Sequence, residues 1–429
     1  MENQPEKVLI ITYYWPPSGG AGVQRWVKFS KYLKTMGFHP VVLTVKPEKA
    51  SYALTDASLG DDVGDVEVHR TDTFEPFQMY KRLLGKKEIP YAGFANETSP
   101  GLLDKVSRFV RGNFFIPDAR RGWNRYALPV ARNLIEKYHI KNLVTTSPPH
   151  STQLIGLKLK AEFELNWVAD LRDPWTDIYY YPLMYHTPCA KKRDKKLERQ
   201  VLQSADAVVA VSDAIKNLYL SKLDTAEQAK FHVIPNGFDE EDFTGVSEPR
   251  KNRDFTITYT GTMAENYHIE TFLRVLGEIS DKGVRLRFVG RVAEKYKSLL
   301  RDSELGDKVV FVPHVKHAEA VRYMVSSDLL LLAIPDVPDN EGILTGKLFE
   351  YLASGVPVLG VGPVNGDAAR IIRECDAGKM FDYGDAAGMK AFLLEKIRRF
   401  AAGKTGSREP RCRQFSREAL TAEMVRLFK

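Results

Sequence analysis

The feature that most constrains the fold is a strand, glycine loop, helix and strand that open the chain in that order. Residues 7–13 (KVLIITY) are a short β-rich run, and a Pro- and Gly-rich loop follows at residues 15–22. Residues 23–36 have helical apolar periodicity up to Gly37, and residues 41–45 (VVLTV) are the next strand. This order is that of a βαβ unit, and such units build parallel sheets covered by helices.

The same order recurs through the rest of the chain. Further strands are predicted at residues 143–146, 167–170, 207–211, 231–234, 256–260, 285–289, 309–312, 329–334 and 356–361. A polar, charge-rich stretch at residues 240–254 separates two halves, and 429 residues are too many for one ordinary core. We therefore predict two Rossmann-like α/β domains, at residues 1–240 and 255–411, followed by a last helical segment at residues 412–429.

Charge, apolar runs and cysteine content indicate the partners, the cellular location and the absence of a disulfide framework. The formal net charge of +7 favours anionic partners: nucleotides, phospholipid surfaces or nucleic acid. No apolar run approaches the roughly 20 residues of a membrane-spanning helix, and the N-terminus lacks the pattern of a signal peptide, so we expect a cytoplasmic protein. Cys189, Cys375 and Cys412 are odd in number and widely spaced, which predicts neither a disulfide framework nor a zinc site.

The strongest candidate for a binding site is the stretch GILTGKLFEYLASGVP at residues 342–357. A loop runs there into a helix that starts near Lys347, and a helix N-terminus binds phosphate through its open backbone N–H groups. Thr345 adds a hydroxyl and Lys347 a charge, while Glu350 lies one turn further on, where it can accept the hydroxyls of a ribose. The alternative is that Thr345 only caps the helix and Glu350 lies on its solvated face.

Two loops of the first half are further candidates. Residues 18–22 (SGGAG) follow the first strand, where glycines allow close approach of a ligand or simply make a tight turn. ADLRDPW places Asp170, Arg172 and Asp173 at the end of another strand. These three are either groups that face a sugar or acceptor, or a buried structural Arg–Asp pair.

In the second half, short polar pairs follow two strands. They are Gly261 with Thr262, and Gly290 with Arg291, and Arg291 is able to neutralise a diphosphate. Ordinary turn chemistry is the alternative for each. No HExxH or paired CxxC pattern occurs, so we expect no metal ion and no cofactor.

Two basic regions are candidates for contact with a membrane. Residues 101–115 combine an apolar helical face with lysine and arginine, as in interfacial helices, and residues 191–199 (KKRDKKLER) are strongly basic. A docked cover helix and a solvated charged face are the alternatives. No recognition motif accompanies the charge, so nucleic acid is not expected as a partner.

Several separate segments resemble the retaining glycosyltransferases of family 4, which have the GT-B fold of two Rossmann-like domains facing across a cleft. They are the opening strand and loop, ADAVVAVSDAIKNLY, FHVIPNGFDEEDF, YTGTMAENYHIETFLRVL, RLRFVGRV and LTGKLFEYLASGVPVLGV. The resemblance implies transfer of a sugar from a nucleotide diphosphate sugar to a cell-surface glycan or lipid-linked acceptor, as in polysaccharide or lipopolysaccharide biosynthesis. It also implies that residues 255–411 bind the donor, that residues 1–240 are the acceptor side, and that the helix at residues 412–429 crosses back to the first domain. Such an acceptor fits a cytoplasmic protein held at the inner face of the cell membrane by the two basic regions.

The resemblance also implies roles for individual residues. Glu350 matches the glutamate that holds the ribose, and Lys347 the backbone and charge at the diphosphate. The expected donor-binding set is Gly19, Gly20, Gly261, Thr262, Gly290, Arg291, Val315, Glu341, Thr345, Gly346, Lys347, Leu348 and Glu350. The expected catalytic set is Asp170, Arg172, Asp173 and Lys347.

Three departures from the family pattern bear on that expectation. Gly342 stands where the family has a second glutamate, and Glu341 is its neighbour. Thr262 stands where the family has an arginine, and residues 266–268 lack the expected lysine. Two alternatives therefore stay open: a non-catalytic scaffold with the GT-B fold, and a sugar-nucleotide 2-epimerase of similar fold.

Overall fold

The computed structural model describes most of the chain. The described residues are 5–52, 54–56, 59–75, 102–224, 228–246, 252–279, 283–301, 303–404 and 412–429. Residue contacts divide the chain into unit 1, Met1–Asn236 with Arg417–Lys429, and unit 2, Gly237–Ser416. The sequence placed the domains at residues 1–240 and 255–411 and the last segment at residues 412–429, and parts of residues 101–115 and 240–254 lie outside the described residues.

Unit 1 contains a seven-stranded parallel sheet with the strand order β3-β2-β1-β4-β5-β6-β7. Its strands are β1 (Glu6–Ile11), β2 (Phe38–Val45), β3 (Glu67–Thr71), β4 (Asn142–Ser147), β5 (Asn166–Leu171), β6 (Ala207–Ala210) and β7 (Phe231–Val233). Its helices are α1 (Ala21–Thr35), α2 (Leu59–Val63), α4 (Leu102–Phe114), α5 (Asn124–Tyr138), α6 (Gln153–Glu162), α7 (Pro188–Ser204), α8 (Asp213–Ser221) and α15 (Arg417–Val425).

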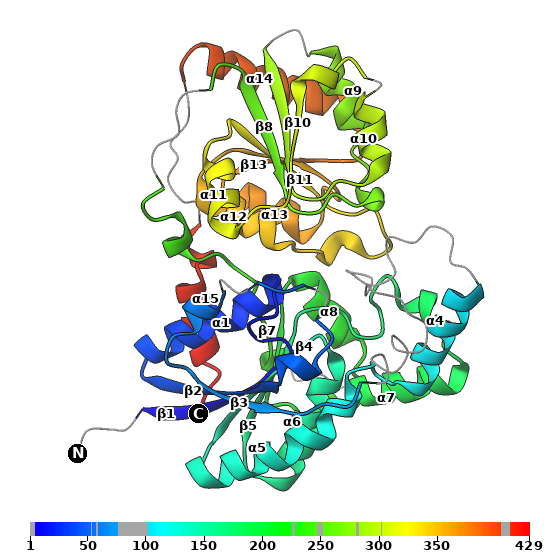
Figure 1. The fold of residues 1–429 in the computed structure, drawn as a ribbon, viewed down its shortest axis with the longest axis vertical. Helices are drawn as coiled ribbons and strands as arrows, with labels where there is room; N and C mark the ends of the chain where they lie inside the picture. Colours follow the sequence, from blue (N-terminus) through cyan, green and yellow to red (C-terminus); the bar gives the residue numbers. More distant parts are fainter. Residues whose placement is uncertain are drawn as a thin grey trace. The chain divides into compact units, whose positions relative to one another are not determined.

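Alternate residues of the central strand β1 belong to opposite cores of unit 1. Leu9 and Ile11 pack in the core formed with α5 to α8, whereas Val8 and Ile10 pack in the core formed with α1, α2 and α15. This is the period of two expected for a strand buried on both faces. The sheet therefore has helices on each side, and α15, at the end of the chain, lies beside α1 (Figure 1).

Unit 2 contains a six-stranded parallel sheet with the order β10-β9-β8-β11-β12-β13. Its strands are β8 (Phe255–Thr260), β9 (Val284–Val289), β10 (Val309–Val312), β11 (Leu329–Ala333), β12 (Val358–Val361) and β13 (Gly378–Phe381). Its helices are α9 (Glu270–Glu278), α10 (Glu294–Arg301), α11 (His317–Val325), α12 (Gly346–Ser354), α13 (Asp367–Glu374) and α14 (Ala386–Ala401). Helices α9, α10 and α14 cover one face of the sheet, and α11, α12 and α13 cover the other (Figure 1).

A disulfide joins two cysteines of unit 2, so the prediction of no disulfide was wrong. Cys375, just after α13, is bonded to Cys412, which precedes the short turn Arg413–Phe415. Wide spacing in the sequence gave no indication of the pair, because the fold brings the end of α13 to within 5.5 Å (Cα–Cα) of a residue 37 positions later. Cys189 of unit 1 remains a free, exposed cysteine.

Candidate functional site

The loops that carry the candidate residues of unit 2 share the carboxyl edge of its sheet. The strand order reverses between β8 and β11, and ligands of open α/β sheets bind at such a reversal, beyond the carboxyl ends of the strands. Gly261 follows β8, Gly290 follows β9 and Val315 follows β10, while α12 begins after β11. The predicted residues therefore lie where this fold binds ligands.

Two glycines at this edge pack so closely that no side chain fits. A Cβ atom on Gly290 would lie 2.3 Å from the carbonyl oxygen of Gly261, and one on Gly261 would lie 2.6 Å from Cε of Lys347. Both glycines also have positive φ angles, of 129° and 93°, which other residues rarely adopt. The glycines thus let the two loops and the Lys347 side chain come together at one point.

The start of α12 has the features of an anion-binding helix terminus. Thr345 is the N-cap residue, yet its side chain makes no capping hydrogen bond, and its buried hydroxyl has no hydrogen-bond partner among the described residues. The N–H groups of Gly346 and Lys347 likewise have no acceptor in the described part of the chain, as expected in a first turn. The N–H of Leu348, by contrast, donates to the Thr345 carbonyl at 3.1 Å.

Lys347 is held in place by a neutral group. Its Nζ donates to the hydroxyl of Tyr259, at 3.0 Å, and lies over the aromatic rings of Tyr259 and Tyr267. No described carboxylate forms an ion pair with it. Burial raises the pKa of Tyr259 far above its ordinary value, so the phenol stays neutral. The ammonium charge therefore stays uncompensated beside the open amides of α12.

Glu350 lies one turn into α12 and is not simply a solvated surface residue. Its Oε1 accepts a hydrogen bond from Nε2 of His317, the first residue of α11, at 3.0 Å. Its other oxygen has no hydrogen-bond donor among the described residues. No sequence pattern pointed to His317, because its partner is 33 positions away.

The remaining candidates of unit 2 differ in how they are placed. Thr262 donates no described side-chain bond, but its carbonyl accepts from the Tyr259 hydroxyl at 2.7 Å. Arg291 and Glu341 are exposed, and the Arg291 carbonyl pairs with the N–H of Met263. The Leu348 side chain is fully buried in the core. Thr262 and Leu348 are therefore fixed by a backbone hydrogen bond and by the core, whereas the side chains of Arg291 and Glu341 are open to solvent.

In unit 1, the start of α1 forms a second open helix terminus. Gly20 is its N-cap, with a positive φ of 106°, and neither a capping side chain nor an acidic residue occupies the first turn. Gly19 makes a backbone bond to Leu54, and Gly22 packs against the guanidinium of Arg172 so closely that a Cβ atom would lie 1.5 Å from its Nη1. Arg172 thus adds a charge at this helix start.

Asp170, by contrast, accepts hydrogen bonds from several donors inside unit 1. It is fully buried, and its carboxylate accepts from Arg25 Nη2 at 3.0 Å, from Trp26 Nε1 at 2.7 Å and from Thr146 Oγ1 at 2.8 Å. Arg25 also donates to the Pro235 carbonyl. Asp170 forms a buried ion pair, but with Arg25 rather than with Arg172, and we therefore expect it to be structural rather than catalytic.

Asp173 and Arg172 lack such partners. No described group donates a hydrogen bond to the Asp173 carboxylate, and burial raises its pKa while Arg172 opposes the rise. Arg172 donates to the carbonyls of Ser147 and Pro148 at 3.0 and 3.2 Å and forms no ion pair in the described part of the chain. Neither side chain therefore has its charge neutralised by a described ion pair at hydrogen-bonding distance.

His150 is a further polar residue near Arg172, and it was not among the predicted site residues. Its ring stacks on Trp175, and its buried Nδ1 has no hydrogen-bond partner among the described residues. Burial, reinforced by the nearby Arg172, lowers the pKa of His150 to about 3, so the imidazole is neutral at physiological pH. The sequence SPPHS gave no pattern that distinguishes this histidine from an ordinary loop residue.

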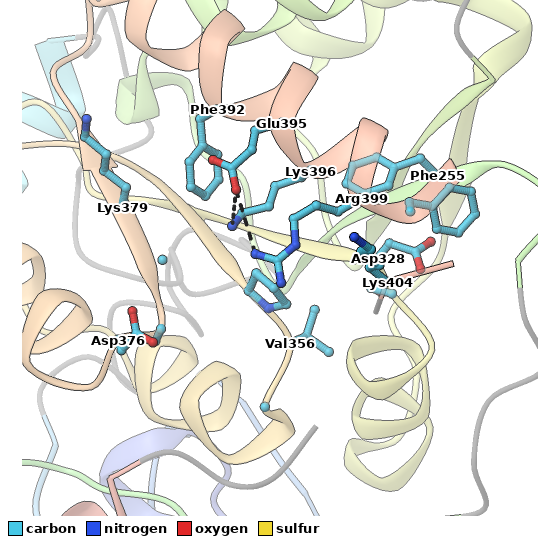
Figure 2. Close-up of a pocket in the computed structure, with 16 residues that line it drawn as sticks. Phe255, Asp328, Val356, Asp376, Lys379, Phe392, Glu395, Lys396, Arg399 and Lys404 are labelled. Carbon is cyan, nitrogen blue, oxygen red and sulfur yellow. Dashed lines mark ion pairs between the residues drawn. The ribbon is translucent and has the colours of Figure 1, made fainter. Parts of the chain in front are cut away.

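A cavity of about 560 Å³ lies at the opposite, amino edge of the unit 2 sheet. Figure 2 shows Glu395 on its wall, paired with Lys396 at 3.6 Å and with Arg399 at 3.8 Å. Helices α12, α13 and α14 end beside it, and helix C-termini disfavour anions. Lys379, Lys396, Arg399 and Lys404 also line the cavity, which lies at the other edge of the sheet from the start of α12.

The comparisons with known proteins decide the family. Residues 19–242 match the sequence profile of Glycosyltransferase Family 4, and residues 254–398 match that of Glycosyl transferases group 1. The chain belongs to glycosyltransferase family 4. It is an enzyme with the GT-B fold, and the resemblance seen in the sequence is confirmed. No curated protein matches this glycosyltransferase.

Solved structures share its fold at low sequence identity. Sucrose-phosphate synthase from Thermosynechococcus elongatus is 16% identical, with a TM-score of 0.64 and 98% of both chains covered. HepE from Anabaena, solved with UDP and glucose, is 14% identical, with a TM-score of 0.56 and 98% of both chains covered. A putative UDP-N-acetylglucosamine 2-epimerase from Listeria monocytogenes is 11% identical, with a TM-score of 0.53 and 98% and 94% covered. The fold is thus common to transferases and epimerases.

Two features are absent from the described residues. No group of three or more His, Cys, Asp or Glu side chains is arranged to hold a metal ion. Within the same part of the chain, no helix is long and apolar enough to cross a membrane.

Proposed function

We propose that the enzyme transfers a sugar from a nucleotide diphosphate sugar, and that unit 2 binds the nucleotide at the start of α12. The observation that carries this is the open helix terminus itself. The amides of Gly346 and Lys347 and the buried hydroxyl of Thr345 are all without partners among the described residues. A diphosphate satisfies all of these donors at once.

The same groups explain how the bond to the leaving group breaks. Negative charge develops on the diphosphate as the sugar departs, and the α12 dipole and the Lys347 ammonium stabilise that charge. We propose that the configuration at the anomeric carbon is retained, as the resemblance to family 4 implies. The proposal needs no metal ion, because the protein supplies the positive charge at the diphosphate.

Unit 1 supplies the groups proposed for the acceptor. Asp173 has a raised pKa, and no described group donates a hydrogen bond to it. Its carboxylate is therefore suited to accept a hydrogen bond from a hydroxyl of the acceptor saccharide. Arg172 and the open start of α1 offer positive charge beside it. The acceptor class we propose is a cell-surface glycan or a lipid-linked saccharide of polysaccharide or lipopolysaccharide assembly.

We also propose that unit 1 attaches the enzyme to an anionic membrane surface. Helix α4 exposes large apolar side chains, which are Val106, Phe109, Val110 and Phe114. The basic helix α7 adjoins it, because the Thr187 N–H at its start donates to Oδ1 of Asn113 at 2.7 Å. The exposed basic residues of α7 include Lys191, Lys192, Arg193, Lys195 and Lys196. An apolar face beside a basic one is suited to a bilayer with anionic lipids.

The two alternatives from the sequence make different predictions. A scaffold that only binds nucleotide would show binding without turnover on any acceptor. A 2-epimerase would consume the donor without an acceptor and release an epimer. The fold does not separate these, but membership of a transferase family favours transfer.

The donor site is tested by thermal stabilisation with UDP, GDP and ADP. A ligand at 100 times its dissociation constant adds about 2.7 kcal/mol to the free energy of unfolding. We expect one diphosphate to shift the melting temperature, and Lys347→Met and Glu350→Gln to reduce that shift. Arg399→Gln, in the cavity of Figure 2, is the control and should shift like the parent. Loss of the shift in the control alone would move the site to the cavity.

The reaction is tested with the sugar donors of the nucleotide that binds. NMR of the product reports the anomeric configuration, and an inverted anomer would reject retention. Asp173→Asn should keep nucleotide binding, because the residue is in unit 1, but lose transfer to the acceptor. A variant that transfers sugar at the parental rate would remove Asp173 from the acceptor site.

Membrane attachment is tested by sedimentation with vesicles of phosphatidylcholine, with or without phosphatidylglycerol. We expect binding only to the anionic vesicles, weakened by salt and by the double change of Phe109 and Phe114 to Ser. Leu299→Ser is a matched control, because Leu299 is as exposed as Phe109, at 43%. Equal binding by the double variant and the parent would exclude α4 as the attachment face.

A further inference from the structure

Helices α11 and α12 place a histidine and a glutamate in contact beside the proposed nucleotide site. Nε2 of His317, the first residue of α11, lies 3.0 Å from Oε1 of Glu350, in the middle of α12. The exposed fractions of the two side chains are 27% and 19%. The pair is therefore partly shielded from water and near enough to the surface for a ligand to reach it.

The chemistry of the pair fixes the direction of the hydrogen bond. An ionised carboxylate only accepts, so Nε2 of His317 must carry the proton and donate it to Oε1. This donation leaves Oε2 of Glu350, which has no donor among the described residues, for another partner. The imidazole therefore selects which of the two carboxylate oxygens faces a ligand.

A role in packing the two helices does not explain the pair. The helices are joined by buried apolar residues, among them Met324 of α11 and Leu348 and Leu352 of α12. An ion pair at this degree of exposure contributes little to stability, in the range of 0–1 kcal/mol. A glutamate without a partner, however, would sample several rotamers and lose that freedom when a ligand binds. Holding Glu350 before the ligand arrives removes that cost.

We propose that His317 is a positioning residue of the nucleotide site, which holds Glu350 so that its other oxygen receives a ribose hydroxyl. This rests on the proposed function, in which unit 2 binds a ribonucleoside diphosphate. His317 then contributes to the preference for ribonucleotides over nucleotides that lack a ribose hydroxyl. It acts through Glu350 and not through a contact with the phosphates.

The test compares variants that keep or remove the donor atom. Gln at position 317 can place an amide N–H where Nε2 stands, whereas Phe keeps the ring shape without a donor. Dissociation constants are measured by calorimetry for the tightest of UDP, GDP and ADP, and for its 2′-deoxy and 3′-deoxy analogues. Arg322→Gln, an exposed change on the same helix, is the matched control.

We expect His317→Phe to weaken binding of the ribonucleotide by about 3- to 10-fold, the range of one hydrogen bond. His317→Gln should restore binding to within about 2-fold, and the Arg322→Gln control should match the parent. The Phe variant should also lose discrimination against at least one deoxy analogue. In Glu350→Ala, the further change His317→Phe should have no effect, because the residue it positions is gone.

The outcomes separate this inference from the proposed function. Parental binding by Glu350→Ala would overturn the placement of ribose at Glu350 and the role of His317 with it. Weak binding by Glu350→Ala together with parental binding by His317→Phe would overturn the role of His317 alone. Equal weakening by the Gln and Phe variants would also overturn it, because the donor atom would then not matter.

Discussion

Removing the carboxylate of Asp170 should make unit 1 easier to unfold. It should leave the reaction of the folded enzyme unchanged. The side chain is fully buried and accepts from Arg25, Trp26 and Thr146 at distances of 2.7–3.3 Å. Without it, the Arg25 guanidinium is a buried charge with the Pro235 carbonyl as its remaining described partner. Breaking a buried ion pair from one side costs about 3–5 kcal/mol.

That free energy is large enough to measure. For a domain of the size of unit 1, each kcal/mol lowers the melting temperature by about 2–4 °C, so Asp170→Ala should melt about 6–20 °C below the parent. Calorimetry gives the melting temperature, and hydrogen exchange at β5 and α1 shows whether unit 1 is the part that opens. Asp173→Asn is the matched comparison, since it lies three positions away but has no described hydrogen-bond donor.

The two variants should therefore separate stability from catalysis. Asp170→Ala should lower the melting temperature and keep its turnover per folded molecule at low temperature. Asp173→Asn should keep the melting temperature and lose turnover. A fully stable Asp170→Ala protein without turnover would refute this reasoning and return Asp170 to the catalytic set. Replacing Arg25 and Asp170 together by Leu should cost less than the two single changes added, because no charge is then left unpaired.

Three other predictions follow from single sites. Reduction of the Cys375–Cys412 disulfide, or Cys412→Ser, should destabilise unit 2 by up to about 4 kcal/mol through loop entropy, and Cys189→Ser is the control. Three titratable thiols in the untreated protein would show that the disulfide is not formed. Burial raises the pKa of Asp194 to about 6 from 3.8, so the folded state binds the extra proton between pH 4 and 6, and stability falls as the pH rises through that window. Asp194→Asn should remove this dependence and gain up to about 3 kcal/mol at pH 8, measured by urea unfolding; a parental pH profile would contradict it. Gly290→Ala should abolish nucleotide binding in calorimetry, because its Cβ would lie 2.3 Å from a carbonyl oxygen of the loop after β8; unaltered binding would show that this loop can move aside.

Every strand inside the two sheets was predicted from the sequence; of the edge strands, β7 and β10 were predicted, and β3 and β13 were missed. A strand covered on both faces is a continuous apolar run, so residues 329–334 (LLLLAI) were read as the strand that the structure gives as β11. Edge strand β3 has the sequence EVHRT, whose side chains are mostly half-exposed, and β13 is the short run GKMF. Neither contains the apolar pattern on which the prediction depends, and both were missed.

The candidate site was predictable where its residues are neighbours in the chain. The α12 start brings together Thr345, Lys347 and Glu350 within one and a half turns, so the sequence places them at once. The partners of Asp170 and Glu350 come from distant segments, Arg25 at 145 positions and His317 at 33. Only the fold brings these partners together, one pair inside the core of unit 1 and the other across α11 and α12.

The partner of a basic residue shows whether a carboxylate already neutralises its charge. Arg25 is neutralised by a buried carboxylate, so its charge has no attraction left for a ligand. Arg172 is held by two backbone carbonyls and Lys347 by a phenol, and neither forms an ion pair in the described part of the chain. Neutral acceptors fix the position of a cation but leave its charge. Each of these two cations lies at an open helix start, α1 in unit 1 and α12 in unit 2, so we expect each helix start to attract an anion.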